Sequence, residues 1–338
     1  MKPKNKKIYI IGNDTLGWSI DKDRTYFIKV INSFKGYELT NSFFKADIIY
    51  AIWWNQIFSF PFSFLLRIFS KKPVIATITN DLEHQRSLLQ KAKKYVNIFV
   101  YANSKQKRVL LEEGVRENQL YFNPFYVDEN LFKKINLSKK KIAQHFNIDY
   151  ALLSNRFLIG SFQRDSLGGA LDTPKWQKNP DMLIDILKKL NSKNTLLLLA
   201  GPRRHYIINQ CRKYKIPYFF IGDERYIDKK EDDLLVNAIE IEDMPYLYNL
   251  IDLYIVSSKS EGGPKAIPES VLSGCKILSS DVGFAKDLLD EQSIYTSADD
   301  AVKKITSLKE KKFQHKVDEN YQFNKFQERI ESILRGVE

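Results

Sequence analysis

The sequence predicts an α/β protein made of two domains, each with a parallel sheet covered by helices. Short apolar runs of strand length alternate with helix-like segments along the whole chain, which is typical of strand-helix-strand units. With 338 residues, 43% of them apolar, the chain is long enough to form two separate cores. We therefore expect two Rossmann-like domains.

The expected strands fall into two sets. The first set is Lys7–Ile11, Asp47–Ile52, Pro73–Ile78, Ile98–Tyr101 and Gln119–Phe122. The second set is Arg156–Gly160, Thr195–Leu199, Tyr218–Ile221, Leu253–Val256 and Lys276–Leu278. A polar stretch between Asp128 and Asn155 separates them. We predict a first domain over residues 1–150, a second over 151–312 and a carboxyl-terminal segment, 313–338, whose residues Asp318–Val337 read as an amphipathic helix.

Cysteine use and hydropathy narrow the class of protein. Cys211 and Cys275 stand far apart, with no CxxC or Cys/His ligand spacing, so we expect a reducing cytoplasm and no structural zinc. No apolar stretch reaches 18 residues, so we expect no transmembrane helix. No Asp-x-Asp lies between apolar strands, and Glu231-Asp232-Asp233 reads as a solvated acidic loop, so we expect no metal ion.

Charge is distributed unevenly along the chain. Of the 53 basic and 41 acidic residues, 25 and 13 lie in residues 1–150, which leaves 28 of each in the rest. The first domain therefore carries the whole net charge of +12. Such a surface favours an anionic partner, for which phospholipid headgroups, a phosphorylated acceptor and nucleic acid all qualify. A general preference for lysine explains the abundance of basic residues but not their asymmetry.

The segment Gln56–Lys72 is unusually aromatic and ends in basic residues. Two interpretations stay open from the sequence. The segment can lie on a membrane surface, where apolar insertion and lysine attraction to anionic lipid act together. It can also pack as a helix between two strands, and both hold if one stripe of the helix faces outward.

The strongest clue to function is a pair of carboxylates, Glu261 and Glu269, in the run Ser260–Ser270. Leu253–Val256 reads as a buried strand, and Ser260 and Pro268 favour a helix start after a glycine loop. A strand, glycine loop and helix in a parallel sheet bring backbone amides to the carboxyl edge, where phosphates bind. Carboxylates beside a phosphate site suit ligand hydroxyls, so the run describes a nucleotide-sugar pocket. The competing interpretation is an ordinary helix start with acidic residues that complement its dipole.

The stretch from Asp243-Met244-Pro245-Tyr246-Leu247-Tyr248 to Ser279-Ser280-Asp281-Val282-Gly283 resembles the donor-binding half of glycosyltransferase family 4. The resemblance rests on the two glutamates with seven residues between them, the preceding Met-Pro helix and the following Asp-Val-Gly. The resemblance spans about residues 157–290. In the first half of the chain only the general order of strands and helices resembles the family. Gly262-Gly263 replaces the more usual Gly-Phe of the family.

This resemblance implies the GT-B fold, with the carboxyl-terminal helix crossing back to the first domain and the active site in a cleft between domains. It also implies a retaining transferase that needs no metal and no protein nucleophile, because the leaving phosphate helps to take the acceptor proton. Arg164 and Lys178 would grip the donor diphosphate, with Lys175 as a rival for the lysine. Glu261 would face the sugar ring. The implied donor-binding residues are Glu269, Gly262, Gly263, Lys265 and Ala266, with base recognition near Ile239 and Glu240.

The acceptor side departs from the family pattern. Asn80 stands where many relatives have a histidine, and His84 is four residues further on, one turn away if a helix has begun. Asn80, Asp81 and His84 are therefore acceptor-side candidates, with Asp14 and Trp54 at the ends of other expected strands. A solitary helical histidine is otherwise a surface or packing residue.

The sequence thus favours a cytoplasmic glycosyltransferase that moves a hexose-like sugar to a glycan or lipid-linked glycan, in bacterial surface polysaccharide synthesis. It would have no cofactor and no nucleic-acid partner, with peripheral contact to the inner face of the cell membrane through its basic first domain. Two alternatives differ in class. One is a noncatalytic nucleic-acid-binding protein, suggested by charge and aromatic content, and the other is a degenerate transferase that binds donor without turnover.

Overall fold

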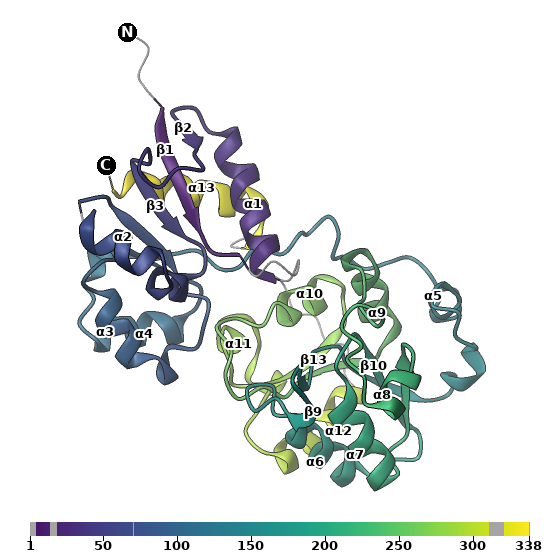
Figure 1. The fold of residues 1–338 in the computed structure, drawn as a ribbon. Coiled ribbons are helices and arrows are strands. Elements are labelled where there is room, and N and C mark those ends of the chain that lie inside the picture. Colours follow the sequence, from purple (N-terminus) through teal and green to yellow (C-terminus); the bar gives the residue numbers. More distant parts are fainter. Residues whose placement is uncertain (1–4, 14–18, 70, 311–320, 338) are drawn as a thin grey trace. The chain divides into compact units, whose positions relative to one another are not determined.

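Two six-stranded parallel sheets form the framework of the computed structural model (Figure 1). The structure describes residues 5–13, 19–69, 71–310 and 321–337. The chain divides into two units, the first made of residues 1–126 and 318–338 and the second of residues 127–317. This confirms the predicted fold class, two Rossmann-like parallel-sheet domains.

The sheet of the first unit has the strand order β2-β1-β3-β4-β5-β6, and neighbouring strands run parallel. Its strands are β1 (Lys6–Ile11), β2 (Tyr37–Leu39), β3 (Ile48–Ala51), β4 (Val74–Thr77), β5 (Ile98–Tyr101) and β6 (Leu120–Phe122). The strand order reverses between β1 and β3, which in such sheets marks the edge where ligands bind.

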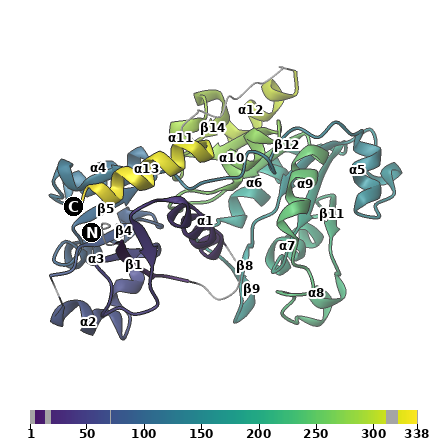
Figure 2. The ribbon, with the colours of Figure 1, turned by 90° about the horizontal axis from the view of Figure 1, so that it is seen from above.

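Alternate side chains of these strands enter two cores, one on each face of the sheet. Ile8 and Ile10 point to one face, where they meet α1 (Ser19–Ser33) and α13 (Phe323–Arg335), and these two helices also contact each other (Figures 1 and 2). Ile11 and Ala51 point to the other face, which is covered by α2 (Phe62–Ile68), α3 (Arg86–Ala92) and α4 (Ser104–Glu112).

The carboxyl-terminal helix α13 belongs to the core of the first unit. Its residues Phe326, Ile330, Ile333 and Leu334 recur at helical spacing and are all buried. Short 3₁₀ turns complete the unit, η1 (Trp54–Phe58), η2 (Leu82–His84) and η3 (Glu117–Gln119).

The sheet of the second unit has the order β11-β10-β7-β12-β13-β14. Its strands are β7 (Phe157–Ser161), β10 (Thr195–Ala200), β11 (Tyr218–Ile221), β12 (Leu253–Val256), β13 (Lys276–Ser280) and β14 (Ile294–Tyr295), and a hairpin of β8 (Ser166–Leu167) and β9 (Ala170–Pro174) stands apart. The chain runs from β7 outward to β11 and then returns to β12 on the other side. The loops after β7 and β12 therefore meet at the switch point of the sheet.

Helices cover both faces of this sheet. The core on one face is filled from α6 (Pro180–Leu190), α7 (His205–Tyr214) and α12 (Ala298–Glu310). The remaining helices and turns are α5 (Lys139–His145), η4 (Tyr150–Leu152), α8 (Arg225–Lys229), η5 (Ile241–Asp243), α9 (Met244–Leu250), α10 (Ala266–Leu272), α11 (Ala285–Leu288) and η6 (Glu291–Ser293).

All ten expected strands exist, within two residues of the predicted ends. The strands that the sequence did not predict are β2 and β14 at the sheet edges and the β8–β9 hairpin. These strands have two to five residues, and an edge strand is covered on fewer sides, so its apolar run is too short to recognise.

The division between the units lies at Tyr126, earlier than the predicted boundary at residue 150. The intervening segment is bound to α9 and its end. Ile135 donates its backbone N–H to Asn249 Oδ1 at 2.9 Å, and Lys139 pairs with Asp252 at 2.5 Å. These contacts place Val127 onward with the second unit.

Candidate active site

The candidate donor site lies in the second unit, at the switch point between β7 and β12. Three segments meet there: Phe162–Arg164 after β7, Lys175–Lys178 before α6 and Ser257–Glu261 after β12. The backbone N–H groups of Lys259 and Ser260 donate to the carbonyl oxygen of Gln177, at 2.8 and 3.3 Å. The sequence motifs that predicted a phosphate site therefore belong to one continuous surface.

Gln163 connects the three segments. Its Nε2 donates to the Lys178 carbonyl at 3.5 Å and to Ser257 Oγ at 3.3 Å, and its Oε1 accepts from Ser258 Oγ at 3.3 Å. Ser257 Oγ also donates to the Lys178 carbonyl, at 2.9 Å. Sequence reasoning missed Gln163, because two of its partners, Ser257 and Ser258, are more than 90 positions away.

Lys178 and Glu261 form an ion pair at the centre of this surface. Both side chains are mostly buried, and Glu261 Oε1 also accepts from Ser258 Oγ at 2.8 Å. Asn179, where the resembling family commonly has glycine, has a left-handed backbone with φ 46°. Asparagine tolerates that conformation better than other residues with a side chain, so the turn that places Lys178 ahead of α6 is kept.

Three cations gather beside Glu261. Burial, and after it the positive charges of Arg164 and Lys178, lowers the pKa of Lys175 to about 8. A lysine pKa lowered in this way indicates a site that is shielded from water and also carries other positive charges. Lys175 and Lys178, the two lysines between which the sequence could not decide, thus both lie in this group of cations. Such a group suits a diphosphate.

Glu269 lies in the first turn of α10 and is fixed by a buried tyrosine. Tyr248 Oη, from α9, donates to Glu269 Oε2 at 2.9 Å. Burial raises the pKa of Tyr248 well above its usual value, and the nearby negative charge of Glu269 adds to the rise, so this hydroxyl stays a donor. The helix of the Met-Pro motif therefore positions the second glutamate.

The glycine loop from Gly262 to Lys265 leads into α10, with Ala266 as its first residue. Pro268 lies in the first turn, as expected, but Ser260 does not cap the helix, since Lys265 occupies the N-cap position. Gly283 has φ +54°, and a Cβ there would lie 2.6 Å from Pro264 Cδ and 2.9 Å from Gly263 Cα. The Asp-Val-Gly turn after β13 thus supports the loop in a way that only glycine permits.

A buried ion pair supports the loop that carries Arg164. Arg204 has no exposed surface and pairs with Asp165 at 2.7 Å. Arg204 also donates to the Gln163 carbonyl and, at 3.1 Å, to Ser161 Oγ. Burial raises the pKa of Asp165 to about 6, an effect that the positive charge of Arg204 opposes. Nothing in the sequence identified this pair.

Ile239 and Glu240, the expected base-recognition residues, precede η5 and α9. Ile239 is half-buried and Glu240 is exposed, and the Glu240 carbonyl accepts from the Asp243 N–H at 3.1 Å. The two residues are thus linked to Glu269 through α9 and its Tyr248.

The acceptor-side candidates lie in the first unit. We expected Trp54 to contact the acceptor, but its side chain is fully buried and cannot do so directly. Its Nε1 donates to Asn80 Oδ1 at 3.1 Å. Asn80 and Asp81 follow β4 and are half-buried. Asp81 Oδ1 accepts from the Glu83 N–H at 3.1 Å, and His84 is exposed at the end of η2. Asp14 lies outside the described residues.

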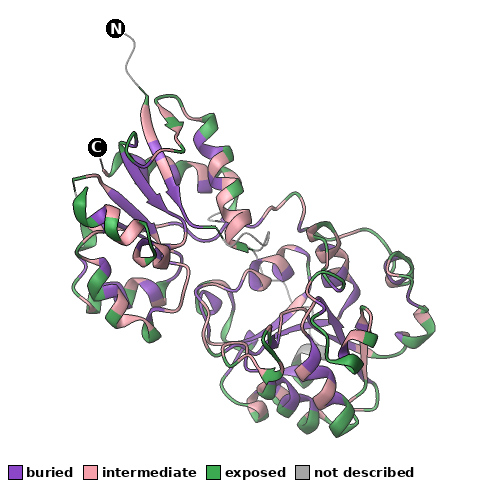
Figure 3. Ribbon diagram, viewed as in Figure 1, coloured by how far each residue is buried: buried purple, intermediate pink, exposed green. Residues whose placement is uncertain are grey.

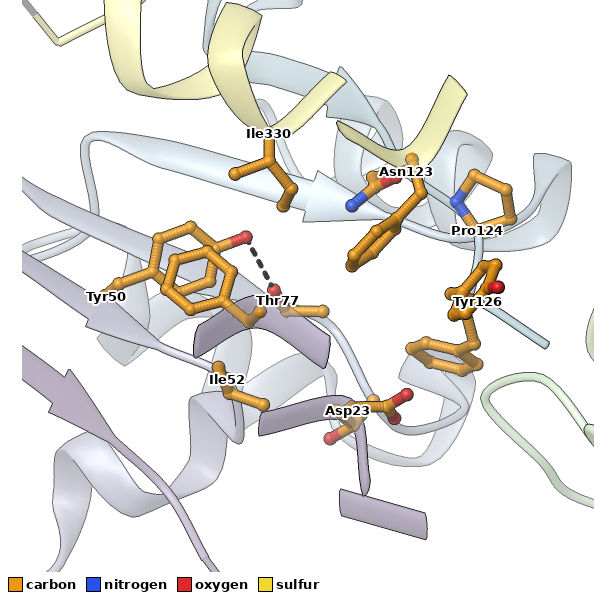
Figure 4. A pocket seen from close by; sticks show the side chains of 12 residues that line it. Asp23, Tyr50, Ile52, Thr77, Asn123, Pro124, Tyr126 and Ile330 are labelled. Carbon is orange, nitrogen blue, oxygen red and sulfur yellow. Dashed lines mark hydrogen bonds between the residues drawn. The ribbon is translucent and has the colours of Figure 1, made fainter. Parts of the chain in front are cut away.

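A small pocket lies at the carboxyl edge of the same sheet, with Asp23, Tyr50, Thr77 and Asn123 in its wall (Figure 4). Its volume is about 30 Å³, which suits one hydroxyl group or a water molecule rather than a sugar ring. Thr77 Oγ1 donates to Tyr50 Oη at 3.3 Å. Asn123 is 6% exposed, and among the described residues its Oδ1 has no hydrogen-bond partner. Such a buried acceptor suits a ligand hydroxyl.

The described residues contain neither a candidate metal site nor a candidate membrane-spanning helix. No group of three or more His, Cys, Asp or Glu residues there could hold a metal ion. No helix among those residues is long and apolar enough to cross a membrane.

Comparison with known proteins identifies the class. Residues 172–324 match the family model of glycosyl transferases group 1. No curated protein sequence matches the chain significantly. The chain therefore carries a glycosyltransferase group 1 domain, which contains Lys178, Glu261 and Glu269.

Solved structures agree on the fold. The structure of Anabaena HepE in complex with UDP and glucose superposes with TM-score 0.72 at 15% identity, covering 98% of this chain and 99% of that one. HepE with UDP-glucose gives 0.67 at 14% identity, covering 98% and 96%. A glycosyltransferase from Rickettsia africae gives 0.62 at 13% identity, covering 98% and 94%. The fold is that of the GT-B glycosyltransferases.

Proposed function

We propose that this protein is a retaining, metal-independent glycosyltransferase that moves a hexose from a uridine diphosphate sugar to a glycan or lipid-linked glycan. The observation that carries the proposal is the ion pair of Lys178 and Glu261 beside Arg164 at the switch point of the second unit. Bacterial surface polysaccharide synthesis suits this acceptor class.

The cations supply the chemistry that a metal supplies in other transferases. As the bond between sugar and phosphate breaks, negative charge grows on the departing diphosphate, and Lys178 and Arg164 stabilise it. Lys175 adds a further positive charge beside them when it is protonated. Cationic side chains fixed in this way remove the need for a divalent ion.

The carboxylates would bind hydroxyl groups. Glu269, held by Tyr248, accepts the two ribose hydroxyls, and Glu261 accepts hydroxyls of the sugar ring. Amides of Gly262, Gly263, Lys265 and Ala266 bind donor oxygens, and backbone groups at Ile239 and Glu240 read the base. A uridine donor is supported by the UDP and UDP-glucose bound to HepE.

The acceptor would bind at the carboxyl edge of the first unit's sheet. Asn80 and Asp81, with His84 nearby, offer polar groups there, and Asn123 Oδ1 offers a buried acceptor for one hydroxyl. The acceptor oxygen bonds to the anomeric carbon on the face from which the diphosphate leaves, and the oxygen of the departing phosphate takes the acceptor's proton. Because attack and departure share one face, the sugar keeps its anomeric configuration.

A thermal-shift panel of UDP, GDP, ADP and UDP-glucose, with and without EDTA, tests the donor. A ligand at 100 times its Kd stabilises the fold by about 2.7 kcal/mol. We expect UDP and UDP-glucose to stabilise the wild type regardless of EDTA, and Glu269→Ala to lose most of the shift. Glu242→Ala, on an exposed acidic residue of η5, is the matched control.

The rival functions give different results. Stabilisation by DNA or RNA with no nucleotide-sugar response would favour the nucleic-acid-binding alternative. Donor binding without transfer or hydrolysis would indicate the degenerate transferase. Where transfer occurs, proton NMR of the product decides the stereochemistry, and an inverted anomeric centre would overturn the retaining mechanism.

A further inference from the structure

Five large apolar residues in and near α2 of the first unit have exposed side chains. The ribbon of this helix contains several exposed positions (Figure 3). We call the five residues the apolar patch: Phe44, Phe60, Phe64, Ile68 and Phe69, with 63, 86, 57, 55 and 37% of their surface exposed. Proteins that stay monomeric in water seldom expose apolar side chains in such a group. The patch therefore indicates a partner.

The helix does not need the patch for its own packing. Phe62, Leu65 and Leu66 turn inward and pack on the core of the first unit. Phe64 and Ile68, one turn apart, point outward. Of the two interpretations that the sequence left open, inward packing is confirmed, and a second stripe of the same helix faces outward.

Contacts beneath the patch hold two of its rings, Phe44 and Phe69, in place. Phe43, which is buried, meets Phe44 and Phe69 edge to face, with ring centroids 6.0 and 6.2 Å apart, and the Phe44 and Phe69 centroids are 5.3 Å apart. Lys72 Nζ donates to the carbonyl oxygens of Phe44, at 3.2 Å, and of Ala46. This part of the patch is preorganised, which lowers the entropic cost of binding.

The charges around the patch identify the partner. Lys45, Arg67, Lys71 and Lys72 lie within or beside it in sequence, against one acidic residue, Asp47, between residues 40 and 72. Asp47 Oδ2 accepts from the Lys7 N–H at 2.8 Å. Aromatic side chains bordered by cations fit the boundary between the headgroups and acyl chains of an anionic bilayer.

We propose that the first unit docks on an anionic lipid surface through the apolar patch, with Arg67 and Lys71 on the phospholipid headgroups. This inference is independent of the proposed sugar transfer, since no residue of the candidate active site takes part. Docking on the lipid surface would bring the enzyme close to a membrane-bound acceptor.

Vesicle flotation of the full-length protein tests the proposal. The two vesicle populations are pure phosphatidylcholine, and equal amounts of phosphatidylcholine and phosphatidylglycerol. We expect flotation with the anionic vesicles alone, weakened by salt. Because each cation near an anionic surface contributes about fivefold in partitioning, Arg67→Gln with Lys71→Gln should lower binding about 25-fold. Phe60→Ser with Phe64→Ser should lower it at least as much.

Matched controls come from the second unit. Leu235→Ser removes an equally exposed apolar side chain, and Lys213→Gln with Lys215→Gln removes the same charge. Both controls should float like the wild type. Equal flotation of the patch variants and the wild type would overturn the proposal. The wild type could also bind neither vesicle type and instead form a dimer. If Phe60→Ser with Phe64→Ser then made the protein monomeric, the lipid proposal would be overturned and the partner would be a second copy of the chain.

Discussion

Lys178 and Glu261 are 83 positions apart in the sequence, yet their side chains form an ion pair above the carboxyl edge of the second sheet. The pair joins the segment before α6 to the loop after β12, and Ser258 hydrogen-bonds the same carboxylate oxygen at 2.8 Å. Glu261 thus pairs with a cation that the proposed reaction needs. Variants of the two residues should therefore affect different ligands and different steps of the proposed reaction.

Removal of Lys178 should affect transfer more than binding. In Lys178→Ala we expect turnover to fall about 100-fold, because the charge that develops on the diphosphate loses a preorganised partner. Steady-state kinetics with UDP-glucose measure the change in kcat. Lys189→Ala removes an exposed lysine of α6 whose partner is Asp299, and its kcat should stay within a factor of two of wild type. Equal kcat in the two variants would contradict the assigned role of Lys178.

Glu261→Gln should weaken the binding of the sugar nucleotide more than the binding of the nucleotide without a sugar. A carboxylate that accepts sugar hydroxyls contributes about 1.5–3 kcal/mol, but UDP has no sugar to bind. We therefore expect the Kd for UDP-glucose to rise at least tenfold while the Kd for UDP changes little. Calorimetric titration of both ligands measures the two constants. Equal losses for both would show that Glu261 acts on the diphosphate through Lys178 instead.

Tyr248→Phe should lower UDP affinity through Glu269. The variant removes the 2.9 Å hydrogen bond that fixes the carboxylate, and we expect stability to fall by about 1 kcal/mol and UDP to bind about tenfold more weakly. Tyr295→Phe is the control, since it removes a buried hydroxyl that donates to the Val256 carbonyl at 3.1 Å. Its stability should fall similarly while UDP affinity is kept. A Tyr248→Phe protein that binds UDP like the wild type would refute the positioning role.

The sequence predicted the framework well because a parallel strand is covered on both faces and reads as an apolar run, as in Leu253–Val256. The resemblance to glycosyltransferase family 4 pointed to Arg164, Lys178, Glu261 and Glu269 as candidates, and in the structure each follows a strand or lies near a helix start. Whether these residues act as proposed is for the experiments to decide.

Other parts of the site were beyond sequence reasoning because their roles depend on distant contacts. Gln163 gains its role from Ser257 and Ser258, which only the pairing of β7 and β12 brings near. Arg204 was hidden for the same reason, because an arginine at a helix start reads as surface charge until its burial is known. Local patterns thus pointed to the candidate site, and tertiary contacts decide what holds its residues in place.

Lys175 should make donor binding depend on pH. Its pKa is about 8, lowered by burial and then by Arg164 and Lys178, and a bound diphosphate favours the protonated form. Binding then takes up a proton above about pH 8, so affinity should fall as pH rises, by at most tenfold per pH unit. Below about pH 7 Lys175 is protonated with or without ligand, and the dependence should vanish.

Calorimetry with UDP-glucose in buffers of different ionisation enthalpy measures this proton uptake directly. Lys175→Met should abolish the uptake and flatten the pH profile, whereas Lys189→Met should keep both. An unchanged profile in Lys175→Met would assign the proton to another group.

Gly283→Ala should damage the donor loop, and Gly36→Ala provides a matched control. Both glycines have positive φ, +54° and +91°, so each alanine costs about 1–2 kcal/mol of backbone strain. At Gly36 a Cβ meets nothing within 4 Å, but at Gly283 it lies 2.6 Å from Pro264 Cδ and 2.9 Å from Gly263 Cα. Gly283→Ala must therefore displace the loop that leads to Glu269. Thermal unfolding with and without UDP should show destabilisation in both variants and lost UDP stabilisation in Gly283→Ala alone. If both variants keep full UDP stabilisation, the loop from Gly262 to Lys265 does not hold the donor.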